Sequence, residues 1–248
     1  SPSRGLGDVY KRQVFKYVSA YKIGSGDITW LDIIKKIAKK KKPVLLATGA
    51  SSFEDVTRSV KEIMKYNKKI VLMQCNTNYT AENANHKFLN LKVLEQFKKK
   101  FKNKVILGLS DHTAGHNSVL GAVAMGARVV EKHFTDDNKR KGPDHKFSMN
   151  TKTWKAMVDE TRMLENSLGD GHKKIEQNEE DAVIVQRRSI RAAKNLFKNE
   201  KIKEDSLIFL RPAPKNSLAP YEKRKILNKT LKKDITKGDL INWSKIKN

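Results

Sequence analysis

Residues 70–111, IVLMQCNTNYTAENANHKFLNLKVLEQFKKKFKNKVILGLSD, decide the fold class of this chain. The stretch opens with an apolar run at 70–74, continues with an amphipathic segment at 88–101, and closes with a second apolar run at 105–109. Each run is continuously apolar rather than alternating, which is typical of strands covered on both faces. A strand, a helix and a strand in this order predict two parallel strands joined by a right-handed crossover.

The same unit repeats on both sides of this stretch. Five apolar runs are expected to form strands: 21–25, 44–48, 70–74, 105–109 and 128–133. Helical patterns follow them: 31–41, a segment capped by Ser51 or Ser52 with Glu54 or Asp55, 88–101, 118–125 and about 151–168. A barrel of eight such units typically takes ~250 residues, and about 150 precede Gly169. The pattern therefore predicts an α/β fold, either five-eighths of a (β/α)8 TIM barrel or a complete open five-stranded sheet.

The remainder of the chain lacks the alternation of apolar runs and amphipathic helices. Residues 170–182 are polar without a period and predict a linker after an α/β domain at 14–169. Residues 183–248 carry short apolar runs between turns, and 201–208 weakly resembles 234–241, so we expect a small, mainly β domain. Residues 1–13 fit no element that should precede a strand, and we expect them to be a non-native segment outside the fold.

Composition excludes several classes of protein. The single cysteine, Cys75, excludes a disulfide scaffold and a cysteine-rich zinc module. No apolar run reaches the ~18 residues that a transmembrane helix needs. The first residues also lack the basic-then-apolar pattern of a signal peptide. The sequence therefore predicts a cytoplasmic enzyme with no membrane partner.

The net charge of +25 raises the question of a nucleic-acid partner, because a basic surface gains affinity from counterion release. The excess consists mostly of lysines spread along the chain, with few aromatic residues between them on which bases could stack. We therefore predict no nucleic-acid partner and a field that attracts anionic substrates. A basic nucleic-acid-binding protein and a non-catalytic sugar-binding module remain as alternatives.

Two histidines follow neighbouring predicted strands. Ligands of parallel α/β folds bind at the carboxyl ends of the strands, where His112 and His133 fall. Imidazoles together with oxygen ligands suit Mn, Fe or Zn, so the pair predicts a metal or catalytic site. The competing interpretation is a pair of structural histidines joined by hydrogen bonds at a barrel rim.

The same strand ends offer an anion site. Lys22 supplies a cation, and neutral donors come from other strand ends: Ser25, Thr48, Asn78 and Ser110. Charge-assisted and directed hydrogen bonds of this kind suit a phosphate or a carboxylate. Asp144 lies after Gly142-Pro143, in a rigid turn that can aim its carboxylate. Cys75 ends a buried run and is interpreted as a core residue.

These strand ends, in this order, resemble the N-acetylneuraminate (sialic acid) synthase family. The matching segments are YKIGSGD at 21–27, PVLLATG at 43–49, QCNTNY at 74–79, GLSDHT at 108–113, EKHFT at 131–135 and GPDH at 142–145. The tail, with RRSI at 187–190 and Arg211-Pro212, resembles the family's C-terminal antifreeze-like (SAF) domain. The resemblance implies the last five units of a TIM barrel followed by a SAF domain, in a homodimer with swapped domains.

The resemblance also implies a reaction. Family members condense phosphoenolpyruvate with an N-acetylated sugar aldehyde, such as N-acetylmannosamine, to give a nonulosonic acid and phosphate for surface polysaccharides. It implies His112 and His133 as ligands of a divalent metal, with Mn²⁺ as the first choice and Mg²⁺ or Co²⁺ as alternatives. It implies catalytic roles for both histidines and for Asp27 and Asp144. Asp27 stands where many members have glutamate, so the identity of the sugar stays open.

Further site residues come from the same resemblance. Lys22, Ser25, Asn78 and Ser110 align with residues that hold phosphoenolpyruvate, Tyr79 aligns with a sugar-side position, and Arg211 aligns with an arginine that reaches the partner subunit's site. Legionaminate, pseudaminate and spore-coat sugar acids are alternative products within the family. Because three strand–helix units of the family's barrel are lacking, we expect this chain to be an N-terminally truncated and inactive fragment.

Overall fold

A computed structural model describes residues 17–80 and 82–247, and these residues form two compact units. The first unit runs to Gly171 and the second begins at His172. The prediction for residues 1–13 lies outside the described residues.

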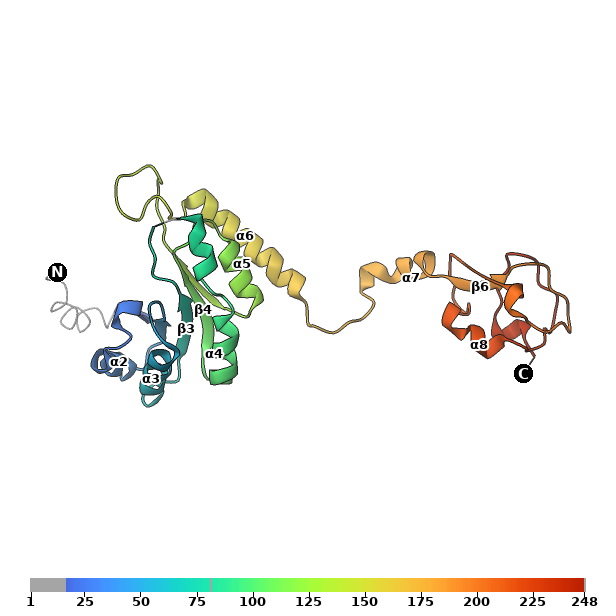
Figure 1. The fold of residues 1–248 in the computed structure, drawn as a ribbon, viewed down its shortest axis with the longest axis horizontal. Coiled ribbons are helices and arrows are strands. Elements are labelled where there is room, and N and C mark those ends of the chain that lie inside the picture. The colour runs from blue at the N-terminus through green and yellow to red at the C-terminus, as the bar shows by residue number, and fades with distance from the viewer. Residues whose placement is uncertain (1–16, 81, 248) are drawn as a thin grey trace. The chain divides into compact units, whose positions relative to one another are not determined.

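A single parallel sheet organises the first unit (Figure 1). Its five strands stand in chain order: β1 Tyr21–Ile23, β2 Val44–Ala47, β3 Ile70–Cys75, β4 Ile106–Asp111 and β5 Val129–Lys132. Every neighbouring pair is parallel, as the alternation of apolar runs and helices predicts. All five strands coincide with the predicted runs to within two residues at each end.

In the described part of the first unit, four α-helices connect the strands, and a fifth follows the last strand. They are α2 Leu31–Ala38, α3 Phe53–Met64, α4 Val93–Phe101, α5 Asn117–Ala124 and α6 Thr151–Leu168. Ser52 caps α3, and Asp55 completes the capping box that the sequence predicts. The helix predicted at 88–101 is wrong at its start, because Asn90 has a left-handed φ of 48° and separates the 3-10 helix Asn83–Phe88 from α4.

The sheet has two different faces because side chains alternate along each strand. On one face, apolar side chains pack with the helices into a core that includes Ile34, Leu46, Val60, Leu72 and Leu109, all 0% exposed. The strand residues that alternate with core residues lie on the opposite face: Lys22 beside Ile23, Ser110 beside Leu109 and Glu131 beside Val130. The core thus fixes which side chains face away from the helices.

The opposite face is concave. Four strand spacings of about 4.8 Å would place β1 and β5 roughly 19 Å apart in a flat sheet, beyond the reach of two side chains. Lys22 on β1 nevertheless forms an ion pair with Glu131 on β5, with 2.6 Å between Nζ and Oε2. The sheet therefore curls into a half-barrel, which is the partial-barrel alternative of the two that the sequence left open.

The second unit has a small core of its own. Its elements are α7 Glu180–Gln186, β6 Ser189–Ala192, β7 Leu207–Leu210 and α8 Lys223–Ile226, and β6 pairs with β7 in antiparallel fashion. The predicted repeat contributes unequally, since 201–208 leads into β7 whereas 234–241 supplies only single bridges to Arg191 and Leu196. Helix α7 was not predicted; it begins inside the stretch expected to be a linker and delays the first strand to Ser189.

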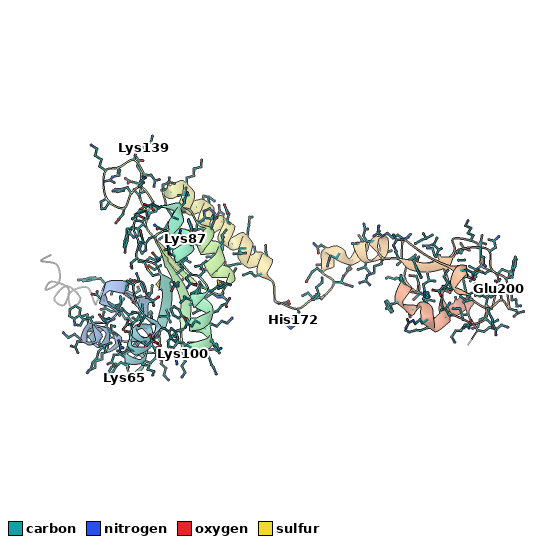
Figure 2. All side chains as sticks on the ribbon, viewed as in Figure 1. Lys65, Lys87, Lys100, Lys139, His172 and Glu200 are labelled. Atoms are coloured by element: carbon teal, nitrogen blue, oxygen red, sulfur yellow. The ribbon has the colours of Figure 1, made fainter. Side chains whose placement is uncertain are left out.

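The surface charge is dispersed over the first unit. Lys65, Lys87, Lys100 and Lys139 are exposed and lie on separate segments (Figure 2). Among the described residues, no helix combines the length and the apolar character needed to cross a membrane.

Candidate active site at the carboxyl ends of the strands

The register of β4 and β5 brings the two predicted histidines together. Ser110 pairs with Glu131 and Asp111 pairs with Lys132, so His112 and His133 occupy the next step of the two strands. Their ring centroids lie 5.1 Å apart, with the planes inclined at 70°. The structure therefore places two imidazoles side by side at the carboxyl end of the sheet.

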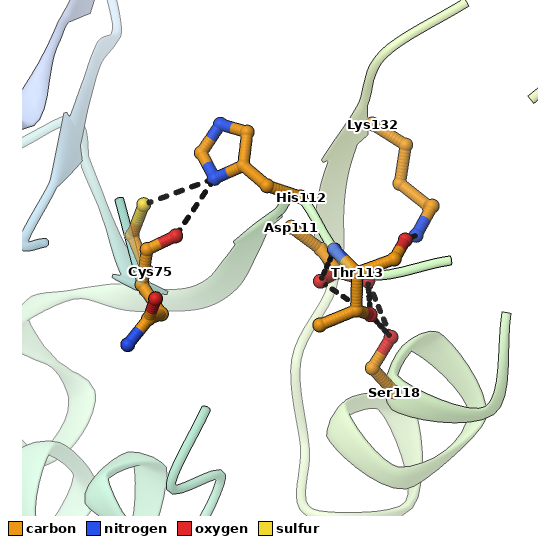
Figure 3. Close-up of polar contacts among 7 residues, drawn as sticks. Cys75, Asp111, His112, Thr113, Ser118 and Lys132 are labelled. Atoms are coloured by element: carbon orange, nitrogen blue, oxygen red, sulfur yellow. Dashed lines mark hydrogen bonds and ion pairs between the residues drawn. The ribbon is translucent and has the colours of Figure 1, made fainter. Parts of the chain in front are cut away.

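The contacts of His112 define its tautomer (Figure 3). Nδ1 lies 2.8 Å from the carbonyl oxygen of Asn76, and 4.0 Å from the sulfur of the buried Cys75. A carbonyl oxygen can only accept a hydrogen bond, so Nδ1 carries the proton. Burial holds the pKa of His112 below its ordinary value, which favours the neutral ring. Nε2 is thus left as an unprotonated nitrogen.

Aromatic and acidic side chains lie beside His133. Nδ1 of His133 lies 3.6 Å from Oδ2 of Asp144, and the Phe147 ring lies 5.1 Å from the His133 ring. The Tyr79 ring lies 4.2 Å from that of His112 and 5.8 Å from that of His133. The structure therefore gathers four of the predicted site residues, Tyr79, His112, His133 and Asp144, into one cluster.

Hydrogen bonds within the loop hold the segment that carries Asp144. The Asn138 amide donates to the carbonyl oxygens of His145 and Ser148, at 2.8 Å each, and its own oxygen accepts from the Asn150 amide at 2.8 Å. Thr135 and His145 are also joined, with 2.7 Å between the hydroxyl and Nδ1. These bonds hold the Asp144 carboxylate near His133 although the loop has no regular secondary structure.

A charged group occupies the concave face beside the histidines. Burial would raise the pKa of Glu131, but the hydrogen bond and charge of Lys22 and a hydrogen bond from Ser110 hold that pKa below its ordinary value. Glu131 therefore stays ionised and brings the predicted anion-binding residues Lys22 and Ser110 to one place.

Ser25 is oriented by the next strand end. Its hydroxyl oxygen accepts a hydrogen bond from the Gly49 amide at 2.9 Å, so the hydroxyl hydrogen can be donated to a ligand. A Cβ at Gly49 would lie 2.5 Å from Cγ2 of Thr77 and 2.9 Å from the Ser25 oxygen. The close approach of these strand ends thus requires glycine at position 49.

Three predicted site residues make no hydrogen bond or ring contact with this cluster in the part of the chain that the structure describes. Asp27 is exposed in the short 3-10 helix Ser25–Asp27, and within the described chain its carboxylate makes no hydrogen bond or ion pair with the other predicted residues. Asn78 is exposed, and its oxygen accepts from the Thr80 amide and the Asn85 side chain. Arg211 belongs to the second unit, where Nε donates to the carbonyl oxygen of Gln186 at 2.6 Å.

Sequence reasoning missed several residues that shape the site. Glu131 and Phe147 were not selected, and neither was the buried ion pair of Asp111 with Lys132, 2.7 Å between Oδ2 and Nζ. The signal for the buried pair was present in the alternation of the strands, which places both residues on the helix side. The pairing of Glu131 with Lys22 had no local signal, because it depends on the curvature of the sheet.

The donor set of the histidine pair fits part of a metal site. Two imidazoles with an unprotonated Nε2 on His112 suit a borderline divalent ion, and the fixed Nδ1 proton is the arrangement that metal-binding histidines adopt. Within residues 17–80 and 82–247, no group of three or more His, Cys, Asp or Glu side chains is placed to hold a metal ion. The residues present thus fit two ligands of an open site.

A curved parallel α/β sheet with its polar cluster at the carboxyl strand ends defines the class of (β/α)-barrel enzymes. The chain belongs to the NeuB family, whose model matches residues 13–173, and a SAF domain matches residues 187–247. The resemblance seen in the sequence is therefore confirmed, as are the barrel-type fold and the SAF domain.

Individual relatives agree with this assignment. The chain is 38% identical to the N,N'-diacetyllegionaminic acid synthase of Campylobacter jejuni, covering 86% of this chain and 64% of that protein. It is 37% identical to a pseudaminic acid synthase of the same species, covering 90% of this chain and 63% of the relative. The crystal structure of N-acetylneuraminic acid synthetase from Leptospira borgpetersenii has a TM-score of 0.64 at 28% identity, covering 71% and 61% of the two chains. The chain thus spans less than two thirds of each relative.

Proposed function

We propose that this chain provides the strand-end site of a NeuB-type synthase that condenses phosphoenolpyruvate with an N-acetylated sugar aldehyde. The observation that carries the proposal is the juxtaposition of two groups of residues. His112 and His133 lie with ring centroids 5.1 Å apart, and Lys22 lies in the concavity beside them, bound to Glu131. The histidine pair suits the activation of a carbonyl group, and Lys22 suits the binding of a phosphate.

The anion-binding residues would hold phosphoenolpyruvate. Lys22 supplies the charge, Ser25 supplies a hydroxyl hydrogen, and the Asn78 amide nitrogen is a further donor because its oxygen is already bonded. The Ser110 hydroxyl, which donates to Glu131, would turn to the ligand only when that bond is released. The reaction forms a bond between C3 of phosphoenolpyruvate and the aldehyde carbon. Water adds at C2, phosphate leaves with cleavage of its C–O bond, and a 2-keto acid remains.

His112 and His133 would hold a divalent metal ion, with Mn²⁺ as the first choice and Mg²⁺ or Co²⁺ as alternatives. Such an ion would polarise the aldehyde oxygen as a Lewis acid. The hydrogen bond between His112 and the Asn76 carbonyl orients the ring that would bind it. Asp144, whose carboxylate lies 3.6 Å from Nδ1 of His133, would take part in proton transfer to the aldehyde oxygen.

An N-acetylated sugar would bind beside the histidines. Tyr79 and Asp144 border the histidines, and we assign sugar contacts to them, to Asp27 and to Arg211 of a partner subunit in a swapped homodimer. Relatives include legionaminic and pseudaminic acid synthases, an N-acetylneuraminate-9-phosphate synthase and a spore coat polysaccharide protein. N-acetylmannosamine and related N-acetylated sugars are therefore the candidates, for a cytoplasmic route to surface polysaccharides.

Binding measurements test the site directly. Titration of the 248-residue chain with phosphoenolpyruvate should show binding that Lys22→Met abolishes, and Mn²⁺ titration followed by electron paramagnetic resonance should show binding that His112→Ala with His133→Ala abolishes. Exposed Lys139→Met and His172→Ala are matched controls and should leave both affinities unchanged. Mn²⁺ binding that survives the double histidine change would contradict the metal assignment.

Turnover needs a different experiment. We expect the 248-residue chain alone to release no phosphate, because five strands do not close an eight-stranded barrel. A chimera supplies further barrel units, with residues 14–248 joined to the preceding barrel units of the legionaminic acid synthase from Campylobacter jejuni. Mass spectrometry with a panel of N-acetylated sugars should then detect a nonulosonic acid that is lost with His112→Ala. Phosphate release by the unmodified chain would contradict the expected inactivity.

A further inference from the structure

A buried ion pair lies beside the backbone of His112, on the helix side of the sheet (Figure 3). The side chains of Asp111 and Lys132 are 0% and 1% exposed, and Oδ2 lies 2.7 Å from Nζ. The two residues are direct partners in the β4–β5 register, and each immediately precedes one of the site histidines. The pair therefore joins the two strands at the last step before His112 and His133.

Every polar atom of this pair is used within one small network. Oδ1 of Asp111 accepts from the Thr113 amide at 2.9 Å and from the Thr113 hydroxyl at 2.8 Å, and Oδ2 accepts from the Ser118 hydroxyl on α5. Nζ of Lys132 also donates to the Thr113 carbonyl oxygen at 2.7 Å. The backbone on both sides of His112 is thus fixed by charge-assisted bonds, which are stronger than neutral ones.

Stability alone does not account for such a pair. Removing two charges from water is costly, and replacing a buried ion pair by neutral residues of similar size is often neutral or stabilising. An ion pair adds a defined geometry between the two strands. It does so at the end of their hydrogen-bond ladder, since β5 stops at Lys132. Beyond this point, the described backbone contacts run from His133 to the loop residue Met149 rather than to β4.

We propose that Asp111 and Lys132 are positioning residues that set the separation and orientation of His112 and His133. The inference rests on the proposed function only in assigning the histidines to a metal. The hydrogen bonds of the network hold the residues on both sides of His112, so the His112 ring is directed to the Asn76 carbonyl. The bonds of the Lys132 ammonium hold the end of β5, immediately before His133. Neither residue touches the concave face, so neither contacts a ligand there.

The test replaces the charges while keeping part of the hydrogen-bonding capacity. Asp111→Asn with Lys132→Met keeps an oxygen that can accept from Thr113, and the new amide nitrogen can donate to the Ser118 hydroxyl oxygen. The Thr113 carbonyl loses its ammonium donor. Two readouts are measured on the 248-residue chain: the His112 tautomer by long-range ¹H–¹⁵N spectra without metal, and Mn²⁺ affinity by electron paramagnetic resonance. Ile63→Val, a buried change on α3, is the control for lost stability.

The expected result is a folded variant in which His112 no longer has a uniform Nδ1–H tautomer and Mn²⁺ binds about 10–100-fold more weakly, the range for loss of an outer contact to a metal ligand. Ile63→Val should change neither readout. A folded variant with the wild-type tautomer and affinity would overturn the inference. A tautomer change in a protein whose wild type binds no Mn²⁺ would support positioning and overturn the metal assignment instead.

A milder variant covers the case in which the double change prevents folding. Ser118→Ala removes one hydrogen bond to Asp111 and leaves both charges in place. It should shift both readouts in the same direction by a smaller amount. Identical spectra and affinity in Ser118→Ala and the wild type would count against the network as the positioning device.

Discussion

Lys22 and Glu131 form an ion pair across the concave face, although they lie on the first and the last strand of the sheet. The pair shows that the ammonium predicted to bind phosphate already has an anionic partner. An incoming phosphate must therefore compete with a carboxylate for Lys22. Under the proposed function, the affinity for phosphoenolpyruvate would depend on how easily the ion pair between Glu131 and Lys22 opens.

This competition predicts that Glu131→Gln tightens phosphoenolpyruvate binding. The change removes both the competing charge and its repulsion of the phosphate. An ion pair this exposed contributes at most about 1 kcal/mol, so the gain should be about fivefold in Kd. Isothermal titration of the chain measures it, with Lys22→Met as the control that abolishes binding in either background. Weaker binding by Glu131→Gln would mean that Glu131 holds the ligand or its water.

Crowding at Gly49 predicts that Gly49→Ala disturbs Ser25. The new methyl group would press on Thr77 and Ser25, so we expect a loss of about 1–3 kcal/mol in unfolding free energy and weaker phosphoenolpyruvate binding. Thr77→Ser removes the nearest carbon and, combined with Gly49→Ala, should restore part of both. Urea unfolding and titration measure the effects. Equal behaviour of the single and double variants would show that the Thr77 methyl is not the obstacle.

The hydrogen bonds of Asn138 predict that Asn138→Ala makes the loop around Asp144 more mobile. Three hydrogen bonds are lost, so the unfolding free energy should fall by about 1–3 kcal/mol, and proteases should cleave within 136–148 more rapidly. Lys139→Ala, an exposed neighbour in the same loop, is the matched control and should behave as the wild type. Unchanged cleavage in Asn138→Ala would show that other contacts hold the loop.

The cap of α3 predicts a pH-dependent contribution to stability. Hydrogen bonds from Ser52 and Arg58 hold the pKa of Asp55 below its ordinary value of 3.8. Asp55 therefore stabilises the fold above pH 3.8, and this contribution is lost as the pH falls through the folded-state pKa. Asp55→Asn should be less stable than the wild type at pH 7, and the difference should shrink below pH 3.8 in urea titrations. Ser52→Ala should cost about 1 kcal/mol at pH 7.

The strands were predictable because each one is a continuous apolar run, and local chemistry alone separates these runs from the helices between them. The Ser52 cap was predictable for the same reason. The break at Asn90 and helix α7 were not, because one depends on a single left-handed residue and the other is only seven residues long, with few positions to reveal a period.

The site was predictable only in its strand-end residues. Tyr79, His112, His133 and Asp144 meet as the sequence order suggests, because parallel strands end on the same edge. The Lys22–Glu131 contact could not be predicted, since it joins residues more than a hundred positions apart through the curl of the sheet. The chemical roles assigned to these residues remain predictions.

The alternation of side chains along β4 and β5 limits how this sequence can change in length. A one-residue deletion within either strand would exchange its two faces, sending Asp111 or Lys132 into the concavity and a histidine into the helix layer. A two-residue deletion would keep the faces but withdraw one histidine from the other by a full step. Insertions and deletions should therefore be confined to the loops around these strands, while the strands themselves accept only substitutions.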